Sequence, residues 1–392
     1  MEEVVICSAV RTPIGNFQGA LSGLCATELG GLVINEAINR AGVHKQDLDE
    51  VIMGNVLPCS LGQNPARQAM IKAGDISFET GALTVNKVCG SGLKAVMLLA
   101  QAIKSGDSEI GVAGGMESMS QAPYYLDKAR SGYRMGNGNI MDHMLHDGLW
   151  DIVNDYHMGY TAELVSDRYG ISKEVMDSWS FDSNMKAIQS FESGKFKEET
   201  IPLSIPQKKR EPILLDKDEG PRLPDMDKIA SLQPAFKKGG LITAGNASKI
   251  SDGASALVVM SEKKAKELGS PILARVVSYA SSGLGLEYVL MSPIKAIPKT
   301  LKRAGLTINE IDLFEINEAF AASTIGVINE LNIDPTKVNV HGGAIALGHP
   351  IGASGARVLT TLLHAMKDRD VKRGLATLCL GGGEAVALIV ER

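Results

Sequence analysis

Short apolar runs along the chain alternate with longer segments in which apolar residues recur every three or four positions. Residues 4–10 and 50–54 are predicted strands, and residues 27–41 are a predicted helix that ends at Gly42. The clearest helix is predicted over residues 93–104, where apolar residues fill every face, so we expect it to be buried all round. This alternation of strands and helices is typical of an α/β fold with a mostly parallel sheet.

The same rhythm continues in the second part of the chain, after an interruption. A predicted strand at 110–113 runs into Gly114-Gly115, and further strands are predicted at residues 254–260, 313–316 and 375–378. Between these, the composition becomes polar, rich in Asp, Lys, Met and Pro. We therefore expect three units: an N-terminal half (residues 1–120 and 246–270), an inserted and partly helical loop domain (121–245), and a C-terminal half (271–392).

The two halves repeat each other. Ala41-Gly42 matches Ala304-Gly305, and Cys89-Gly-Ser-Gly matches Gly352-Ala-Ser-Gly, and both matches are separated by 263 positions (304 − 41 and 352 − 89). A looser third match relates Gly114-Gly115 to Gly382-Gly383. Matches in the same order indicate a duplicated α/β half, and we expect a cleft where equivalent loops of the two halves meet.

Charge and composition narrow the classes of function. The 392 residues carry a net charge of −5 and no basic helix, so we expect neither a nucleic acid nor a membrane as partner. Acidic residues precede the first apolar run, which is unlike a signal or transit peptide, and no run approaches ~18 apolar residues. Five cysteines, an odd number, indicate free thiols and a cytoplasmic location.

One of these cysteines is a candidate nucleophile. Cys89 follows a strand-like run and precedes the helix at 93–104, so its sulfur should lie at a helix N-terminus, where N–H groups and the dipole stabilise a thiolate. The alternative is an unreactive cysteine in the core. The segment Gly90 to Ala95 also fits the pattern G-x-G-x-x-A, but it lies far from the first strand, where a dinucleotide site would begin.

Two glycine-rich segments of the C-terminal half could supply the other groups. Five glycines lie among residues 341–355, and with Pro350 they hold His349 in an irregular loop, which favours a general base; His341 is interpreted as structural. Cys379 precedes three glycines, whose N–H groups could form an oxyanion hole, or it is a buried cysteine beside a turn. The spacing of Cys and His favours no metal site, and the chain contains no phosphate-binding loop.

Taken together, these motifs resemble the thiolase family over essentially the whole chain. The segments that carry the resemblance are V-C-G-S-G at 88–92, G-V-A-G-G-M-E-S-M at 111–119, T-A-G-N-A-S-K-I-S-D-G at 243–253, N-E-A-F-A at 317–321, G-G-A-I-A-L-G-H-P-I-G-A-S-G at 342–355 and C-L-G-G-G at 379–383. The resemblance implies an α/β fold of two βαβαβαββ halves in a five-layered αβαβα core, with an inserted loop domain. It also implies a reversible condensation of two acetyl-CoA to acetoacetyl-CoA and CoA.

The resemblance further implies a role for each catalytic residue. Cys89 is the nucleophile that carries the acyl group, and His349 activates it. His349 and a water held by Asn317 form a first oxyanion hole, and the N–H groups of Cys89 and Gly381 form a second. Cys379 is the acid/base that removes the α-proton of the second acetyl-CoA.

The remaining expectations concern coenzyme A, which enters as a substrate, so no cofactor is expected. The residues implied in binding it are His157 and Ser248 at the pantetheine, Met158 in the acyl pocket, Ala319 and Phe320 in the N-E-A-F-A run, and Arg222, Lys208, Lys209 and Arg210 as candidates for the phosphates. The resemblance also suggests a homo-oligomer, a tetramer of tight dimers.

One departure from the family pattern affects chain-length specificity. Short-chain members carry M-G-x-G-P where this chain has Val289-Leu290-Met291-Ser292-Pro293, a bulkier wall for the acyl pocket.

Three alternatives for the function stay open. One is a 3-ketoacyl-CoA thiolase of broader chain length, and another is a non-catalytic acyl-CoA or lipid carrier. The third is a ketoacyl synthase, which would carry His in place of Asn317 and lack Cys379.

Overall fold

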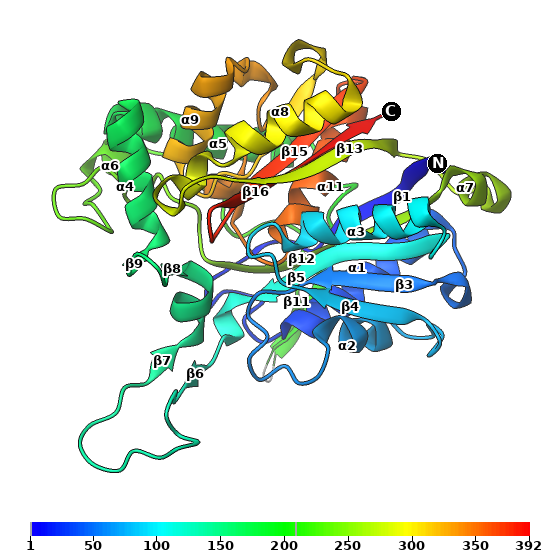
Figure 1. Cartoon of the computed structure of the whole chain (residues 1–392), viewed down its shortest axis with the longest axis horizontal. Coiled ribbons are helices and arrows are strands. Elements are labelled where there is room, and N and C mark those ends of the chain that lie inside the picture. The colour runs from blue at the N-terminus through cyan, green and yellow to red at the C-terminus, as the bar shows by residue number, and fades with distance from the viewer. Residues whose placement is uncertain (1, 208–209) are drawn as a thin grey trace.

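The computed structural model describes residues 2–207 and 210–392 and shows two α/β halves packed together with an insertion at one end (Figure 1). The elements of the N-terminal half are β1 (Val4–Arg11), β2 (Gly15–Asn16), α1 (Ala26–Ala41), β3 (Glu50–Gly54), α2 (Pro65–Lys72), β4 (Gly81–Val85), α3 (Ser91–Ser105), β5 (Ile110–Ser118), β12 (Ser251–Ser261) and α7 (Glu262–Leu268). Those of the C-terminal half are β13 (Ala274–Gly283), α8 (Pro293–Ala304), β14 (Leu313–Ile316), α9 (Ala321–Leu331), α10 (Ala344–Leu347), α11 (Ser354–Asp368), β15 (Arg373–Leu380) and β16 (Glu384–Glu391).

The insertion contains short strands and three helices. Its elements are β6 (Tyr124–Tyr125), β7 (Met141–Asp142), β8 (Trp150–Asp151), β9 (Tyr156–His157), α4 (Met158–Tyr169), α5 (Lys173–Glu192), β10 (Leu203–Gln207), β11 (Arg210–Leu215) and α6 (Met226–Ser231). Short 3₁₀ or π turns complete the described chain: η1 (Lys45–Asp47), η2 (Met119–Gln121), η3 (Met144–Leu149), η4 (Leu286–Met291), η5 (Ile308–Glu310) and η6 (Pro335–Lys337). The residue limits predicted for the three units stay a prediction.

The duplication predicted from the sequence is visible in the order of the strands. The N-terminal order is β1-β12-β5-β3-β4, and the C-terminal order is β13-β16-β15-β14. In both halves the first two pairings are antiparallel and the next is parallel. In the N-terminal half a further parallel pairing joins β3 to β4. At the corresponding place in the C-terminal half, the structure has an isolated parallel bridge between Phe314 and Val338. β1 and β13 join the halves through a short antiparallel pairing.

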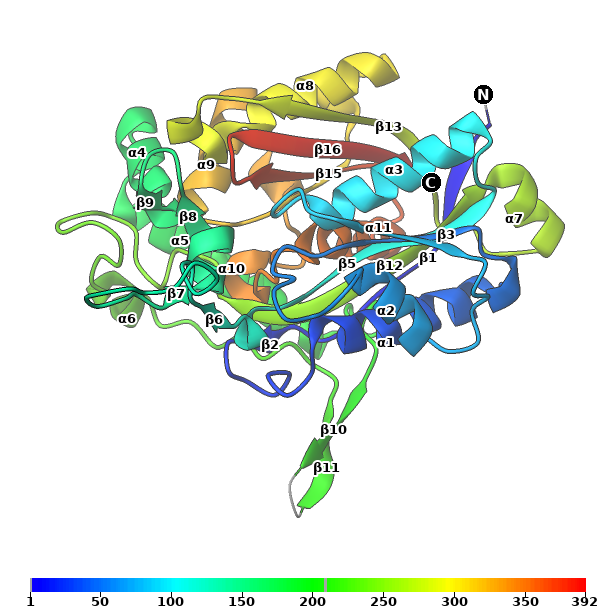
Figure 2. The same ribbon diagram turned by 60° about the horizontal axis from the view of Figure 1, so that its bottom comes forward.

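Five layers result, as the resemblance implied. In Figure 2, α3 and α11 lie between the two sheets, α1 and α2 cover one outer face, and α8 covers the other. The central layer contributes 14 of the 31 buried residues of one cluster, among them Leu93, Val96, Leu359 and Leu362. One side of α3 is less buried than the rest, because Lys94 and Leu98 are half-buried and Gln101 and Ser105 are exposed, so the prediction of burial on all sides was wrong for this side.

The repeated helix ends are explained by backbone conformation. α1 ends at Gly42 with φ of 67°, and α8 ends at Gly305 with φ of 69°, both in the left-handed region that glycine adopts without strain.

The third sequence match, between Gly114-Gly115 and Gly382-Gly383, is not confirmed by the structure. β5 continues through Gly114 and Gly115 to Ser118, whereas Gly382 and Gly383 form the turn between β15 and β16.

Glycine also allows the two central helices to begin against each other. A Cβ on Gly92 would lie 2.7 Å from the backbone nitrogen of Ala356, and one on Gly355 would lie 2.2 Å from that of Leu93. A Cβ on Gly115 would lie 2.1 Å from the carbonyl oxygen of Gly352, so the loop before α11 rests directly on β5. The loops that precede α3 and α11 are therefore held side by side.

A buried charge cluster joins the insertion to both halves. Arg11 in β1 pairs with Glu199 and Asp218 of the insertion, each at 2.6 Å, and the three side chains are fully buried or nearly so. Thr361 of α11 donates a hydrogen bond to Glu199 at 3.0 Å. In the part of the chain that the structure describes, no helix is long and apolar enough to cross a bilayer.

We expect Gly355→Ala to lower the free energy of unfolding by about 1–3 kcal/mol, because the added methyl group overlaps the backbone of α3. The measurement is the midpoint of thermal unfolding followed by circular dichroism. Gly23→Ala is the matched control, since nothing lies within 4 Å of its Cβ position. Equal midpoints for the two variants would contradict this account of the helix contact.

Candidate active site

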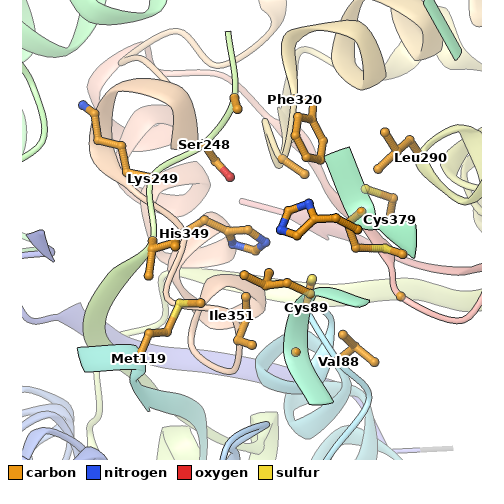
Figure 3. Close-up of a pocket in the computed structure, with 18 of the residues that line it drawn as sticks. Val88, Cys89, Met119, Ser248, Lys249, Leu290, Phe320, His349, Ile351 and Cys379 are labelled. Carbon is orange, nitrogen blue, oxygen red and sulfur yellow. The ribbon is translucent and has the colours of Figure 1, made fainter. Parts of the chain in front are cut away.

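A cavity of about 470 Å³ lies where loops of the two halves and the insertion meet. Most of the predicted site residues line it, namely Cys89, His157, Met158, Ser248, Ala319, Phe320, His349, Cys379 and Gly381. Figure 3 shows Cys89, His349 and Cys379 around the same space. Residues more than 200 positions apart in the sequence are thus brought together, as the duplicated halves led us to expect.

The loop before α3 presents Cys89 through a tight set of local hydrogen bonds. The Ser91 hydroxyl accepts from the N–H of Lys87 at 2.8 Å and donates to the carbonyl of Val88 at 2.6 Å. Val88 has a φ of 45°, which is strained for a β-branched residue. Strained backbone is a common feature of functional sites, and here it lies directly before Cys89.

The thiol of Cys89 is protonated at neutral pH. Burial raises its pKa to about 11, although hydrogen bonds from the backbone N–H groups of Gly381 and Cys89 itself lower it. N–H groups thus favour the thiolate, although they come from Gly381 and Cys89 and not from the first turn of α3 as the sequence suggested, and burial outweighs them. The same two N–H groups come from the two halves and point to one place.

His349 is held as a neutral base. Its Nδ1 lies 2.6 Å from the Ser354 hydroxyl, which donates its own proton to the carbonyl of Pro350 at 2.8 Å. Nδ1 must then carry the ring proton, which leaves the lone pair on Nε2. Burial, and then the nearby positive charge of Arg357, lower the pKa of His349 to about 3. Such an imidazole can accept a proton from a thiol in the cavity only as the sulfur reacts.

Asn317 supports His349 from the end of β14. Its backbone N–H donates to the carbonyl of Thr377 in β15 at 3.1 Å, which continues the parallel pairing of these strands. Its Nδ2 lies 3.4 Å from Nε2 of His349, and the side chain is buried. The structure therefore places Asn317 beside His349, and its role in holding a water stays a prediction.

Cys379 lies at the end of β15, next to a turn made of glycines. Burial, and then the neighbouring Cys89, raise the pKa of its thiol to about 12. Gly382 and Gly383 have φ of 85° and 83°, so only glycine forms this turn without strain. The Cβ position of Gly381 lies 3.1 Å from the Val88 side chain, which places the turn against the Cys89 loop.

Three contacts that the sequence analysis missed hold these loops. The Glu318 carboxylate accepts hydrogen bonds from Trp179 and Ser183 of α5, and from Asn339 and Ile345 near the His349 loop. The Glu117 carboxylate accepts from the side chain of Asn55 and the N–H groups of Val56, Leu57 and Gly352. An ion pair between Lys87 and Glu384 connects the Cys89 loop to the strand after Cys379. The one signal in the sequence for these contacts was that Glu117 and Glu318 each lie within a motif of the resemblance.

The wide part of the cavity is apolar and aromatic. His157 stacks on Phe236 with ring centroids 4.7 Å apart, and Phe236 packs edge-on against Phe320. The N–H of Ser248 donates to the carbonyl of Ala319 at 2.9 Å. Phe236 is a further lining residue that the sequence analysis missed, because a single aromatic in a polar insertion carries no pattern.

Of the predicted basic residues, Arg222 is exposed and lines a separate cavity with residues such as Asn184 and Lys228. Burial, and then the charge of Arg222, lower the pKa of Lys249 to about 8, and Lys249 lines the main cavity. Lys208 and Lys209 lie outside the described residues, and Arg210 is described only as the first residue of β11. Their part in binding phosphates stays a prediction.

Comparison with known proteins agrees with this geometry. Residues 4–263 match the family model of the thiolase N-terminal domain, and residues 270–392 match that of the thiolase C-terminal domain. The chain belongs to the thiolase family. It is 52% identical to an acetyl-CoA acetyltransferase of Pseudomonas aeruginosa and 53% identical to one of Escherichia coli, with 100% of both chains covered in each case. The crystal structure of the Bacillus anthracis acetyl-CoA acetyltransferase superposes with a TM-score of 0.97 at 42% identity, over 100% of this thiolase and 99% of that chain.

Because the pKa of Cys89 is raised to about 11, its thiolate fraction should rise about tenfold per pH unit between pH 6 and 9. We expect the rate of alkylation of Cys89 by iodoacetamide to follow that slope. The measurement uses a variant of this thiolase in which Cys25 and Cys59, which do not line the cavity, are replaced by serine, and mass spectrometry locates the adduct. A rate that does not change with pH in this range would instead indicate a thiolate–imidazolium pair with His349.

Proposed function

We propose that this thiolase is an acetyl-CoA C-acetyltransferase, which joins two acetyl-CoA reversibly into acetoacetyl-CoA and CoA. The observation that carries the proposal is one cavity holding two thiols, Cys89 and Cys379, and a neutral imidazole, His349. The full-length relatives named as acetyl-CoA acetyltransferases support it. A ketoacyl synthase would not need Cys379, and a carrier would not need three reactive groups in contact with one cavity.

In the first half-reaction, the Cys89 sulfur attacks the carbonyl carbon of acetyl-CoA while its proton passes to Nε2 of His349. The bond between that carbon and the CoA sulfur breaks, and Cys379 gives its proton to the departing sulfur. One thioester replaces another, so the acetyl group is transferred with little change in bond energy. The N–H groups of Cys89 and Gly381 stabilise the negative oxygen that develops on the carbonyl.

In the second half-reaction, the Cys379 thiolate removes an α-proton from another acetyl-CoA. His349, now protonated, and Asn317 stabilise the enolate oxygen. The α-carbon then attacks the acetyl carbon on Cys89, the new carbon–carbon bond forms, and the bond to the Cys89 sulfur breaks. The proton on His349 returns to Cys89, which restores both thiols. No group outside the chain and its substrates is required, so we propose that the reaction uses no cofactor.

Coenzyme A enters along the apolar part of the cavity. We propose that His157 and Ser248 contact its pantetheine arm, with Ala319 and Phe320 opposite, and that Met158 borders the acyl group; all five line the cavity. Val289 and Leu290 of η4 also line it, so the acyl chain length accepted depends in part on this loop. Because all five cysteines are free, we place the protein in the reducing cytoplasm.

We also propose that the protein forms a homo-oligomer, a tetramer of dimers. β4 is the end strand of its sheet, its sequence from 81 to 85 holds no charge, and Leu83 and the nearby Phe78 are 43% and 77% exposed. Such an edge readily pairs with another copy. The long loop between β6 and β7 stands away from the molecule and exposes Met135 and Ile140, which suits a second contact (Figure 1).

The two cysteines should be separable by mutation. We expect Cys379→Ala still to accept an acetyl group from acetyl-CoA onto Cys89, but to lose condensation and α-proton exchange with solvent by about 10²–10⁴-fold. Cys89→Ser should lose acyl transfer altogether, because a serine hydroxyl is far less ionised than a thiol. The measurements are labelled acetyl-enzyme by mass spectrometry and deuterium incorporation into acetyl-CoA. Wild-type exchange in Cys379→Ala would return that cysteine to a structural role.

Light scattering should give the mass of an oligomer at micromolar concentration. Leu83→Lys places a charge on the exposed edge of β4 and should shift the population towards smaller species. Lys263→Glu on the exposed face of α7 serves as the control for a change of charge elsewhere. A wild-type monomer would contradict the proposed assembly.

A further inference from the structure

A buried arginine lies directly behind the active site and takes no part in the steps above. Arg357 is on α11, one turn after Ser354, and only 2% of it is exposed. Its Nη2 lies 3.5 Å from Oδ1 of Asn317, and its Nη1 lies 3.7 Å from a carboxylate oxygen of Glu315. Glu315 is on β14, two residues before Asn317, and is equally buried.

This pair is poorly satisfied for its depth. Among the described residues, Nε and Nη1 of Arg357 and both carboxylate oxygens of Glu315 have no hydrogen-bond partner. Buried charges usually destabilise a fold unless their hydrogen bonds are complete, so the pair is a weak candidate for a purely stabilising role. Within the same described part of the chain, the hydrogen bond of Arg357 goes to Asn317, a residue of the active site.

The contacts form a closed ring that includes the catalytic imidazole. Arg357 donates to Asn317, Nδ2 of Asn317 faces Nε2 of His349, and Nδ1 of His349 contacts Ser354. Ser354 and Arg357 lie on successive turns of α11, so one rigid helix holds both ends of the ring. Asn317 is the one member whose amide could rotate and exchange its oxygen and nitrogen.

A guanidinium decides that orientation, because it carries donors and no acceptor. With Oδ1 turned to Arg357, the N–H groups of Asn317 must face His349. In the reverse orientation two sets of donors would meet, and Oδ1 would favour a proton on Nε2 of His349. That tautomer could not take the proton of Cys89.

We propose that Arg357 is a positioning residue, which fixes the amide of Asn317 so that its N–H group points at His349. Other charged groups that face Arg357 are Arg11, Glu199 and Glu318. None of these hydrogen-bonds to the Asn317 amide within the described residues, so the orientation depends on Arg357. The inference rests on the proposed function and adds to it a residue outside the cavity wall.

The test is a double-mutant cycle in the full-length enzyme, with thiolysis of acetoacetyl-CoA by CoA as the assay. We expect Arg357→Met to lower kcat by about 10–100-fold, because a displaced Asn317 weakens the oxyanion site, while KM stays within about twofold. In an Asn317→Ala background the same change should lower kcat by less than about threefold. Equal losses in both backgrounds would overturn the proposal.

Two further variants keep the test decisive. Thr360→Val removes another buried polar group of α11, whose hydroxyl contacts Ser255 and not Asn317, and should leave kcat unchanged. If Arg357→Met does not fold, Arg357→Lys retains the charge but offers a point donor in place of a planar fork, and the same cycle applies.

A readout without activity separates this inference from the proposed function. In a crystal structure of Arg357→Met or Arg357→Lys, the Asn317 side chain should rotate away from His349, while the contact of His349 with Ser354 remains. An unmoved Asn317 would refute the positioning role. A wild-type enzyme that cleaves no 3-ketoacyl-CoA would refute the proposed function and leave the crystallographic test standing.

Discussion

The structure depends on the close contact between the first turns of α3 and α11. Gly92 and Gly355 let the backbones of these helices meet, and no side chain fits between them. Each helix starts directly after a loop that carries chemistry, so the contact sets the distance between Cys89 and His349. Duplication of one α/β half thus produces a single asymmetric site, because equivalent loops carry different residues.

Burial then determines the chemistry of this site. The two thiols and the imidazole are all shifted towards their neutral forms, since each lies in a cavity with apolar and aromatic walls. A neutral site holds no charge that must be neutralised when an uncharged thioester enters. In the proposed reaction charge appears only as bonds change, next to the N–H groups of Cys89 and Gly381, which already face the Cys89 sulfur.

The loops of the site are irregular, and buried polar groups take the place of regular secondary structure. Glu117 and Glu318 each accept four hydrogen bonds, and the donors to each carboxylate come from segments that are far apart in the chain. These carboxylates link the insertion and both halves to the His349 loop. Arg357 acts in a similar way on the amide of Asn317. That amide can rotate, and a neighbour with donors only is compatible with one of its two orientations.

The sequence by itself determined the α/β class, the duplication, the insertion and the catalytic candidates Cys89, His349 and Cys379, because periodicity and glycine-rich motifs are local features. It could not determine that Gly114 and Gly115 continue a strand, since their role is to let a distant loop rest on β5. Phe236, Glu318 and Arg357 were also missed, because their importance lies in contacts between residues far apart in the chain. Only the tertiary structure decided the pKa shifts, since burial depends on every segment that covers a group.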